Sequence, residues 1–337
     1  MKILLVNYEY TLTGSALILV SLAEHLRRSG HDVSVCAAVP ATGPIKDMYQ
    51  QGGFAVLDLP IAGKFDVAIC STVMTAPQLL ALPPAMKIVW WLHEGSIGLE
   101  ILLRFPAHVA AFGRANAIVF PIAHLRDDIY RSFTHGHEAS RVAVIPYGIP
   151  AVQANATRRE ADDAFRVVSV GSVYPRKGHM DLIRAMALYR NPAAHCTIVG
   201  KFYSLPDDCL QLIEANPTKF ELTGELDRAG TVQRLSNADV FCLPSYSEVM
   251  PLAILEAAML ERPLVLSDLR VYEGFWRHGR NALLYPVGDI GLLAQSIAML
   301  AVSRELRIRL GAAARKTAAA YTEAAFYSRF DALLNGL

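Results

Sequence analysis

The chain has 337 residues, of which 53% are hydrophobic, and its 32 basic and 31 acidic residues leave a net charge of +1. This length and composition predict a globular protein of about two domains. The balanced charge argues against a dedicated nucleic-acid binder. Five scattered cysteines without a CxxC pair argue against a disulfide framework and a zinc site.

The N-terminal segment predicts a strand rather than a targeting signal. Its apolar run, Ile3 to Val6, is followed at once by polar residues and is too short for a secretory signal. Val67 to Met86 carries no charge, but its three prolines favour a strand and a short helix over a membrane span. We therefore expect a cytoplasmic protein without a transmembrane segment.

Short β-rich runs alternate with helical stretches over the first 150 residues, which predicts a parallel sheet with helices on both faces. A helix is expected over Gly14 to Ser29. The expected strands are Lys2 to Asn7, Asp32 to Val39, Phe65 to Ser71, Lys87 to Leu92, Ala117 to Phe120 and Val142 to Ile145.

A polar stretch, Gln153 to Ala164, is interpreted as a hinge, and the alternation restarts after it. The expected strands are Phe165 to Val173, Cys196 to Val199, Phe220 to Thr223, Asp239 to Pro244 and Pro263 to Ser267. The expected helices are His179 to Tyr189, Gly230 to Asn237, Pro251 to Leu260 and most of the chain beyond Asp289. The fold class is thus α/β, with two Rossmann-like doubly wound domains facing across a cleft that their loops would serve.

The loop after the first strand holds a single glycine, Gly14, whereas a dinucleotide fingerprint needs three. A nicotinamide or flavin role is therefore disfavoured. Gly14 and Ser15 offer amide groups to an anion at the helix start, but from this loop alone a simple cap is favoured.

Two cations, Arg176 and Lys177, follow the strand that starts at Phe165 and precede a helix. A cation fixed there would stabilise the charge of a departing diphosphate. The two residues are equally well explained as solvated charges in a turn.

Glu248 and Glu256 flank a predicted helix start, with Pro251 at the first helical position. A helix N-terminus suits a diphosphate, and the flanking carboxylates suit sugar hydroxyls. This pattern matches a nucleotide sugar, with its sugar at Glu248 and its ribose at Glu256. Alternatively, Glu248 complements the helix dipole and Glu256 is an exposed helical residue.

The spacing of these two glutamates, in Ser-Glu-x-x-Pro-Leu-x-x-Leu-Glu-Ala, resembles the Glu-x7-Glu signature of retaining GT-B glycosyltransferases, particularly family GT4 (glycosyl transferases group 1). Val170 to Gly178 resembles that family's phosphate loop, and Val144 to Ile149 resembles its interdomain turn. The resemblance is strong from about Val142 to Pro286. It implies an acceptor-binding domain over 1–150, a nucleotide-sugar-binding domain over 151–315, and a C-terminal helix over 316–337 that can pack back on the first domain.

By this resemblance, Lys177 binds the donor diphosphate, Glu248 the sugar hydroxyls and Glu256 the ribose, and backbone amides near Met250, Leu252 and Ala253 hold a phosphate. The chain departs from the family twice. Ser172 stands where an arginine often follows the glycine of the phosphate loop, leaving open whether Arg176 replaces that arginine. Pro251 has no amide hydrogen to donate.

His93 ends a strand in Val-Trp-Trp-Leu-His-Glu and resembles the family's cleft histidine, which implies a contact with the sugar or the acceptor. Such a histidine is otherwise usually structural. Glu94 either assists acceptor binding or is a solvated charge at a helix start.

The resemblance implies a retaining transfer without an enzymic nucleophile, in which the acceptor attacks the face that the nucleotide diphosphate leaves. The chain has no Asp-x-Asp and no HExxH pair, so no metal or other cofactor is expected. The partners would be a nucleotide sugar and a sugar, lipid-linked or small-molecule acceptor. A nucleotide-sugar epimerase or hydrolase, and a non-catalytic nucleotide-sugar-binding module, remain alternatives. Leu99 to Arg114 is either a membrane-facing surface or ordinary helix packing.

Overall fold

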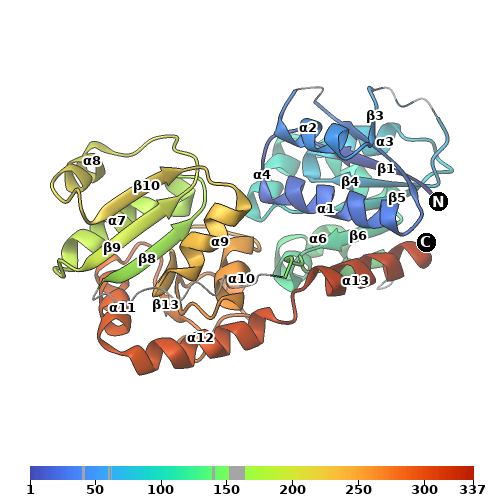
Figure 1. The fold of residues 1–337 in the computed structure, drawn as a ribbon. Coiled ribbons are helices and arrows are strands. Elements are labelled where there is room, and N and C mark those ends of the chain that lie inside the picture. The colour runs from blue at the N-terminus through green and yellow to red at the C-terminus, as the bar shows by residue number, and fades with distance from the viewer. Residues whose placement is uncertain (40–41, 60, 62, 139–140, 152–163) are drawn as a thin grey trace. The chain divides into compact units, whose positions relative to one another are not determined.

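The computed structural model describes the chain except for residues 40–41, 60, 62, 139–140 and 152–163. It divides into two compact units (Figure 1). Unit 1 comprises Met1–Gly148 together with Glu323–Leu337, and unit 2 comprises Ile149–Thr322. Of the hinge expected over 153–164, only Ala164 is among the described residues.

Unit 1 contains a sheet of seven described strands in the order β3-β2-β1-β4-β5-β6-β7, and every neighbouring pair is parallel. The strands are β1 Lys2–Asn7, β2 Asp32–Ala37, β3 Ala55–Val56, β4 Val67–Ser71, β5 Lys87–Trp91, β6 Ala117–Phe120 and β7 Val142–Val144.

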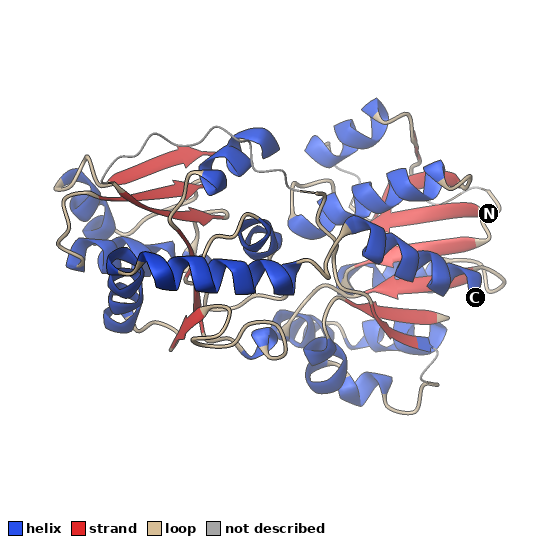
Figure 2. Cartoon of the chain, turned by 60° about the horizontal axis from the view of Figure 1, so that its bottom comes forward, coloured by secondary structure: helices blue, strands red, loops and turns tan. Residues whose placement is uncertain are grey.

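Helices cover both faces of each unit's sheet (Figure 2). Those of unit 1 are α1 Gly14–Arg28, α2 Pro44–Gln51, α3 Ala76–Ala81, α4 Ser96–Arg104, α5 Ala110–Arg114, α6 Arg131–Thr134 and α13 Glu323–Asn335. A π-helical turn, Leu125–Ile129, precedes α6. Because β1 lies between β2 and β4 under these layers, its four central residues are almost fully buried, which explains its unbroken apolar run.

The last helix, α13, belongs to unit 1 although the whole of unit 2, about half of the chain, separates it in sequence from the rest of that unit. Phe326 and Phe330 are buried and lie with their ring centroids 5.6 and 5.0 Å from Trp91 of β5. Asp331 accepts a hydrogen bond from His25 of α1 at 2.9 Å. These contacts make α13 part of the hydrophobic core of unit 1.

Unit 2 contains a second parallel sheet, with six described strands in the order β10-β9-β8-β11-β12-β13. Its strands are β8 Phe165–Val170, β9 Ala194–Val199, β10 Phe220–Gly224, β11 Val240–Leu243, β12 Leu264–Ser267 and β13 Leu283–Tyr285. Its helices are α7 His179–Leu188, α8 Asp207–Glu214, α9 Arg228–Ser236, α10 Leu252–Met259, α11 Ile290–Val302 and α12 Arg304–Ala318.

The strand order of unit 2 reverses between β8 and β11, which are neighbours in the sheet but not in the sequence. In open α/β sheets, ligands bind outside the carboxyl ends of the strands at such a switch point. The loops that leave β8 and β11 are therefore the place to look for a ligand site. Among the described helices, none has the length and apolar character that crossing a membrane requires.

Candidate active site

The loop after β8 brings two cations to the switch point of unit 2. It contains a 3-10 turn, Pro175–Lys177, which ends at Gly178 with a φ of +67°. A Cβ atom on Gly178 would lie 2.0 Å from the carbonyl oxygen of Pro244, just after β11. Only glycine permits both this conformation and this approach. Gly178 thus lets the loops after β8 and β11 lie against each other.

Lys177 and Glu248 meet where these loops touch. Lys177 Nζ donates a hydrogen bond to Glu248 Oε1 at 2.6 Å, and the carboxylate is 6% exposed. Ser245 Oγ donates to the same oxygen at 2.8 Å. A carboxylate this deeply buried requires such partners, because leaving its charge unpaired away from water is costly.

Arg176 also lies close to this carboxylate and is more exposed than Lys177. Its Nη1 lies 3.6 Å from Glu248 Oε2 and donates to the carbonyl of Ser247. Its Nε donates to the hydroxyl of Tyr174 at 3.1 Å. The structure therefore places both predicted cations beside Glu248, and Lys177 is not the freely solvated charge of the alternative interpretation.

The helix start after Glu248 differs in one detail from the prediction. Pro251 was expected at the first helical position, but α10 begins at Leu252 and Pro251 is its N-cap residue, with extended backbone angles. The expectation was wrong by one residue because a proline fixes φ but leaves ψ open. The amides of Leu252 and Ala253 are consequently the first two of the helix, where no intrahelical acceptor exists. Met250, before them, is buried.

Glu256 lies in the second turn of α10 and has its own cation. Arg228 Nη1, at the start of α9, is 3.6 Å from Glu256 Oε1, and the glutamate side chain is only 15% exposed. Burial raises the pKa of Glu256, and the nearby guanidinium opposes that shift. The interpretation of Glu256 as an exposed helical residue is therefore wrong.

The remaining residues predicted to bind the donor, Ser172, Gly14 and Ser15, lie in a loop of unit 2 and at the start of α1. Ser172 is half-buried in the loop after β8. In unit 1, α1 starts at Gly14, and Thr13 rather than Ser15 caps it by accepting the amide of Ala16 at 3.3 Å. The segment is thus the simple helix start that the sequence favours, with the cap at Thr13 and with Gly14 and Ser15 inside the first turn.

His93 lies just beyond the carboxyl end of β5 in unit 1 and is almost completely buried. Its Nδ1 lies 2.6 Å from the hydroxyl of Tyr147. Burial lowers the pKa of His93 to about 3, so the ring is neutral at physiological pH. Within the part of the chain that the structure describes, Nε2 is buried without a hydrogen-bond partner.

Glu94 stabilises the backbone around His93 instead of projecting into solvent. Its carboxylate accepts the amides of Val73 and His93, each at 3.0 Å. Burial raises the pKa of Glu94, whereas these hydrogen bonds lower it. Of the two interpretations of Glu94, the solvated charge is excluded by these contacts.

Several partners of the predicted residues were missed, among them Tyr147, Arg228 and Ser245. Ser245 follows a strand end and precedes Glu248 by three residues, which is a usable local signal. Tyr147 and Arg228 are distant in sequence from the residues they contact. Only the folded topology reveals these two.

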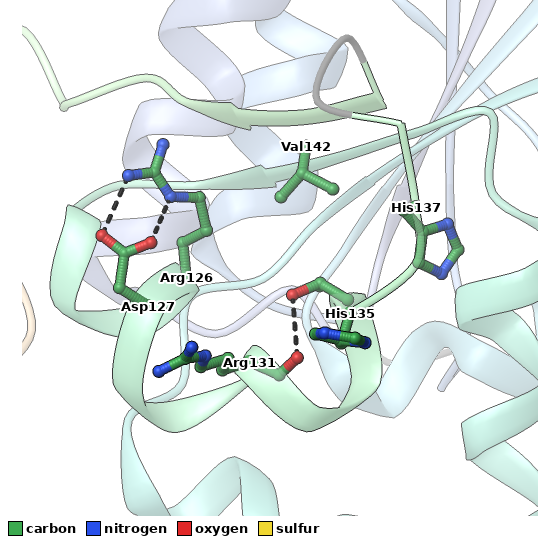
Figure 3. A pocket seen from close by; sticks show the side chains of 7 residues that line it. Arg126, Asp127, Arg131, His135, His137 and Val142 are labelled. Carbon is green, nitrogen blue, oxygen red and sulfur yellow. Dashed lines mark hydrogen bonds and ion pairs between the residues drawn. The ribbon is translucent and has the colours of Figure 1, made fainter.

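A separate pocket of about 500 Å³ lies beside the edge strand β7 (Figure 3). Arg126 and Arg131 line it with His135 and His137, and Asp127 pairs with Arg126 through hydrogen bonds of 2.6 and 2.9 Å. None of the residues predicted for the site lines this pocket. Among the described residues, no group of three histidine, cysteine, aspartate or glutamate side chains is placed to hold a metal ion.

Comparison with known proteins gives a family match to most of unit 2. Residues 153–317 match the family described as glycosyl transferases group 1. The N,N'-diacetylbacillosaminyl-diphospho-undecaprenol alpha-1,3-N-acetylgalactosaminyltransferase of Campylobacter jejuni is 32% identical over 31% of this chain and 27% of that protein. The alpha-galactosylglucosyldiacylglycerol synthase of Streptococcus pneumoniae is 35% identical over 34% of this chain and 31% of that protein. The match thus spans about a third of the length of these curated relatives.

Solved structures resemble the chain over its whole length. Anabaena Alr3699/HepE in complex with UDP and glucose has a TM-score of 0.78 at 19% identity, covering 100% of both chains. Sucrose-phosphate synthase from Thermosynechococcus elongatus has a TM-score of 0.77 at 17% identity, covering 100% of this chain and 98% of that one. The predicted fold class of two Rossmann-like domains is confirmed: the chain has the GT-B fold, and its residues 153–317 match the glycosyl transferases group 1 family.

Proposed function

We propose that the chain is a retaining glycosyltransferase of family GT4, which moves a sugar from a nucleotide diphosphate sugar to an acceptor hydroxyl. The observation that carries this proposal is the pairing of Lys177 with Glu248 at the switch point of unit 2, inside the region that matches glycosyl transferases group 1. A cation for the diphosphate and a carboxylate for the sugar are held there by the same pair of loops.

In this proposal Lys177 binds the donor diphosphate, together with Arg176 and the first amides of α10 at Leu252 and Ala253. Glu248 accepts hydrogen bonds from the sugar hydroxyls, and Glu256 accepts them from the ribose. Donor binding exchanges the partners of Lys177 and Glu248, because each is bonded to the other in the structure. Ser245, which also bonds Glu248, holds the carboxylate in place during that exchange.

The proposed chemistry needs no metal ion and no enzymic nucleophile. The bond between the anomeric carbon and the diphosphate oxygen breaks, and a bond to the acceptor oxygen forms on the same face of the sugar. The acceptor proton passes to the departing phosphate oxygen. Lys177 stabilises the negative charge that develops on this oxygen. This charge is larger in the transition state than in the bound donor, so Lys177 stabilises the transition state more strongly.

The acceptor is proposed to be a sugar or a lipid-linked molecule in or near the cytoplasm. The two curated relatives carry a diphospho-undecaprenol and a diacylglycerol in their names. In this chain, Ile97 and Leu103 on α4 and the following Phe105 are exposed beside Arg104. Apolar side chains next to a cation suit peripheral contact with an anionic bilayer. Co-sedimentation with anionic vesicles tests that contact, and Leu103→Ser should bind the vesicles less than the wild type does.

The proposal is tested by incubating the purified chain with UDP-, GDP- and ADP-linked sugars and with carbohydrate and lipid-linked acceptors. We begin with UDP-glucose, which a structural neighbour binds. Transfer that persists in EDTA, with NMR showing the donor's anomeric configuration in the product, supports the proposal. Inverted configuration contradicts the retaining mechanism, and dependence on a metal ion contradicts the metal-independent one.

Two other outcomes separate the proposal from its alternatives. Substantial donor turnover without any acceptor favours an epimerase or a hydrolase. Donor binding by thermal shift, without any product from the acceptor panel, favours a non-catalytic binding module.

A further inference from the structure

The Nδ1 atom of His93 is held by Tyr147, which lies 54 positions further along the chain within unit 1. The two atoms are 2.6 Å apart. Either group could donate at this distance, but a phenol O–H is a stronger acid than the N–H of a neutral imidazole, and the bare imidazole nitrogen is a stronger base than a phenol oxygen. The phenol hydroxyl is therefore assigned as the donor and Nδ1 as the acceptor.

This direction fixes the tautomer of the histidine. A neutral imidazole carries one proton, so a ring that accepts at Nδ1 carries its proton on Nε2. The environment keeps the ring neutral, since burial lowers the pKa of His93 to about 3. Burial also raises the pKa of Tyr147, so the phenol keeps its proton.

The other contacts of His93 fix the ring and leave only Nε2 available for a ligand. Its backbone amide donates to Glu94 at 3.0 Å, and its ring packs with centroid distances of 4.7 Å to Trp91 and 5.8 Å to Tyr147. In the described part of the chain, Nε2 is the ring atom left buried without a hydrogen-bond partner. Because buried N–H groups are normally hydrogen-bonded, an N–H at this position is suited to donate to an acceptor on a ligand.

We infer that Tyr147 is a positioning residue that holds His93 in its Nε2–H tautomer and directs this N–H at an oxygen of the bound carbohydrate. The identity of the ligand rests on the proposed glycosyltransferase function. The tautomer and its cause do not, because they follow from contacts within unit 1 alone.

The tautomer is measured by long-range proton–nitrogen NMR on the full chain labelled at its ten histidines. His93→Gln identifies the signals of His93 by their loss. We expect a protonated Nε2 and an unprotonated Nδ1 in the wild type, and a mixture of both tautomers in Tyr147→Phe. Tyr49→Phe is the matched control, because it removes another buried hydroxyl of unit 1, which donates to Asn7. A wild-type ring protonated at Nδ1, or a tautomer unchanged in Tyr147→Phe, overturns the inference.

Kinetics test whether this positioning serves the reaction. Tyr147→Phe keeps the aromatic ring and removes only the hydrogen bond to His93. We therefore expect kcat to fall roughly threefold to tenfold, which corresponds to the loss of one hydrogen bond, with little change in the donor KM. Tyr49→Phe should retain the wild-type kcat. An unchanged kcat in Tyr147→Phe overturns the positioning role. Absence of transfer by the wild type with every donor defeats the proposed function instead, and the NMR result then stands on its own.

Discussion

Lys177 and Glu248 neutralise each other, at a distance of 2.6 Å and with little exposure to solvent. A diphosphate competes with Glu248 for the ammonium group, and a sugar hydroxyl competes with Lys177 for the carboxylate. Variants of Lys177 should therefore weaken the interaction with the diphosphate, and variants of Glu248 the interaction with the sugar.

Lys177→Ala removes the cation that would stabilise the departing diphosphate. We expect kcat/KM to fall by about 10²–10³, which is typical for losing one charge-stabilising contact in the transition state. Circular dichroism should show an unchanged fold. Lys316→Ala, an exposed position on α12, is the control, and a Lys177→Ala variant with most of its activity would contradict the assignment.

Glu248→Gln should separate nucleotide binding from transfer. Without the competing carboxylate, the affinity for UDP alone should rise by roughly fivefold, equivalent to about 1 kcal/mol of relieved competition. Transfer should fall, because the amide is a weaker acceptor for sugar hydroxyls than the carboxylate. Calorimetry with UDP measures the first effect. Glu221→Gln, which breaks the ion pair with Arg234, should show neither change.

How far the sequence predicts these residues depends on where their partners lie in the chain. Lys177, Glu248 and Glu256 stand in motifs with fixed spacing. The place of the first two in loops after strands, and of Glu256 in the following helix, could therefore be predicted. Their immediate partners could not. Arg228 of α9 contacts Glu256 of α10, and two strands and three α-helices of unit 1 lie between His93 and Tyr147 in the sequence. Short sequence motifs do not indicate such long-range contacts.

At the level of elements, the loops after β8 and β11 depend on one glycine for their contact. Gly178→Ala adds a Cβ atom to a residue with positive φ and also forces it against the carbonyl of Pro244. Gly274→Ala is a matched control, because Gly274 has a φ of +86° but open space around it. The control should lose about 1–2 kcal/mol of unfolding free energy from backbone strain alone.

Gly178→Ala should lose more stability than that control, and it should also lose activity, since the 2.6 Å contact between Lys177 and Glu248 depends on the two loops staying together. Chemical denaturation and a transfer assay measure the two effects. Equal losses of stability in both variants would show that the contact with Pro244 is unimportant.

The helix α13 should contribute strongly to the stability of unit 1. Phe330→Ala removes a fully buried ring that packs on Trp91, so we expect a loss of about 3–5 kcal/mol in the free energy of unfolding. Ser328→Ala, on the exposed face of the same helix, should change it little. A loss below about 1 kcal/mol in Phe330→Ala would mean that α13 is only loosely attached.

The regular elements were predictable from periodicity because burial on both faces of a parallel sheet imposes unbroken apolar runs, as in β1. The two shortest edge strands were not. β3 has two residues and β13 has three, so each offers too few residues for a period to appear. The helical turn at Pro251 also began one residue later than predicted.

Over the whole molecule, each unit buries a histidine whose pKa is lowered to about 3, His93 in unit 1 and His179 in unit 2. An unfolded histidine titrates near pH 6.5. Between these two values the unfolded chain binds more protons than the native one, so stability falls as the pH falls. Each residue contributes a slope of up to about 1.4 kcal/mol per pH unit.

Urea unfolding measured from about pH 7 to pH 5 tests this prediction. His93→Gln and His179→Gln should each reduce the pH dependence by about one proton. A pH dependence that survives in the double variant would assign the acid sensitivity to other groups.

Unit 1 is made of two stretches of chain, 1–148 and 323–337, with the whole of unit 2 between them. On the ribosome, the sheet that contains Trp91 therefore emerges long before Phe326 and Phe330 are translated. Throughout the synthesis of some 170 intervening residues, that aromatic face has none of the covering that α13 later supplies. Unit 1 therefore reaches its full stability only after unit 2 has been synthesised, and we expect the early intermediate to bind chaperones through the uncovered aromatic face.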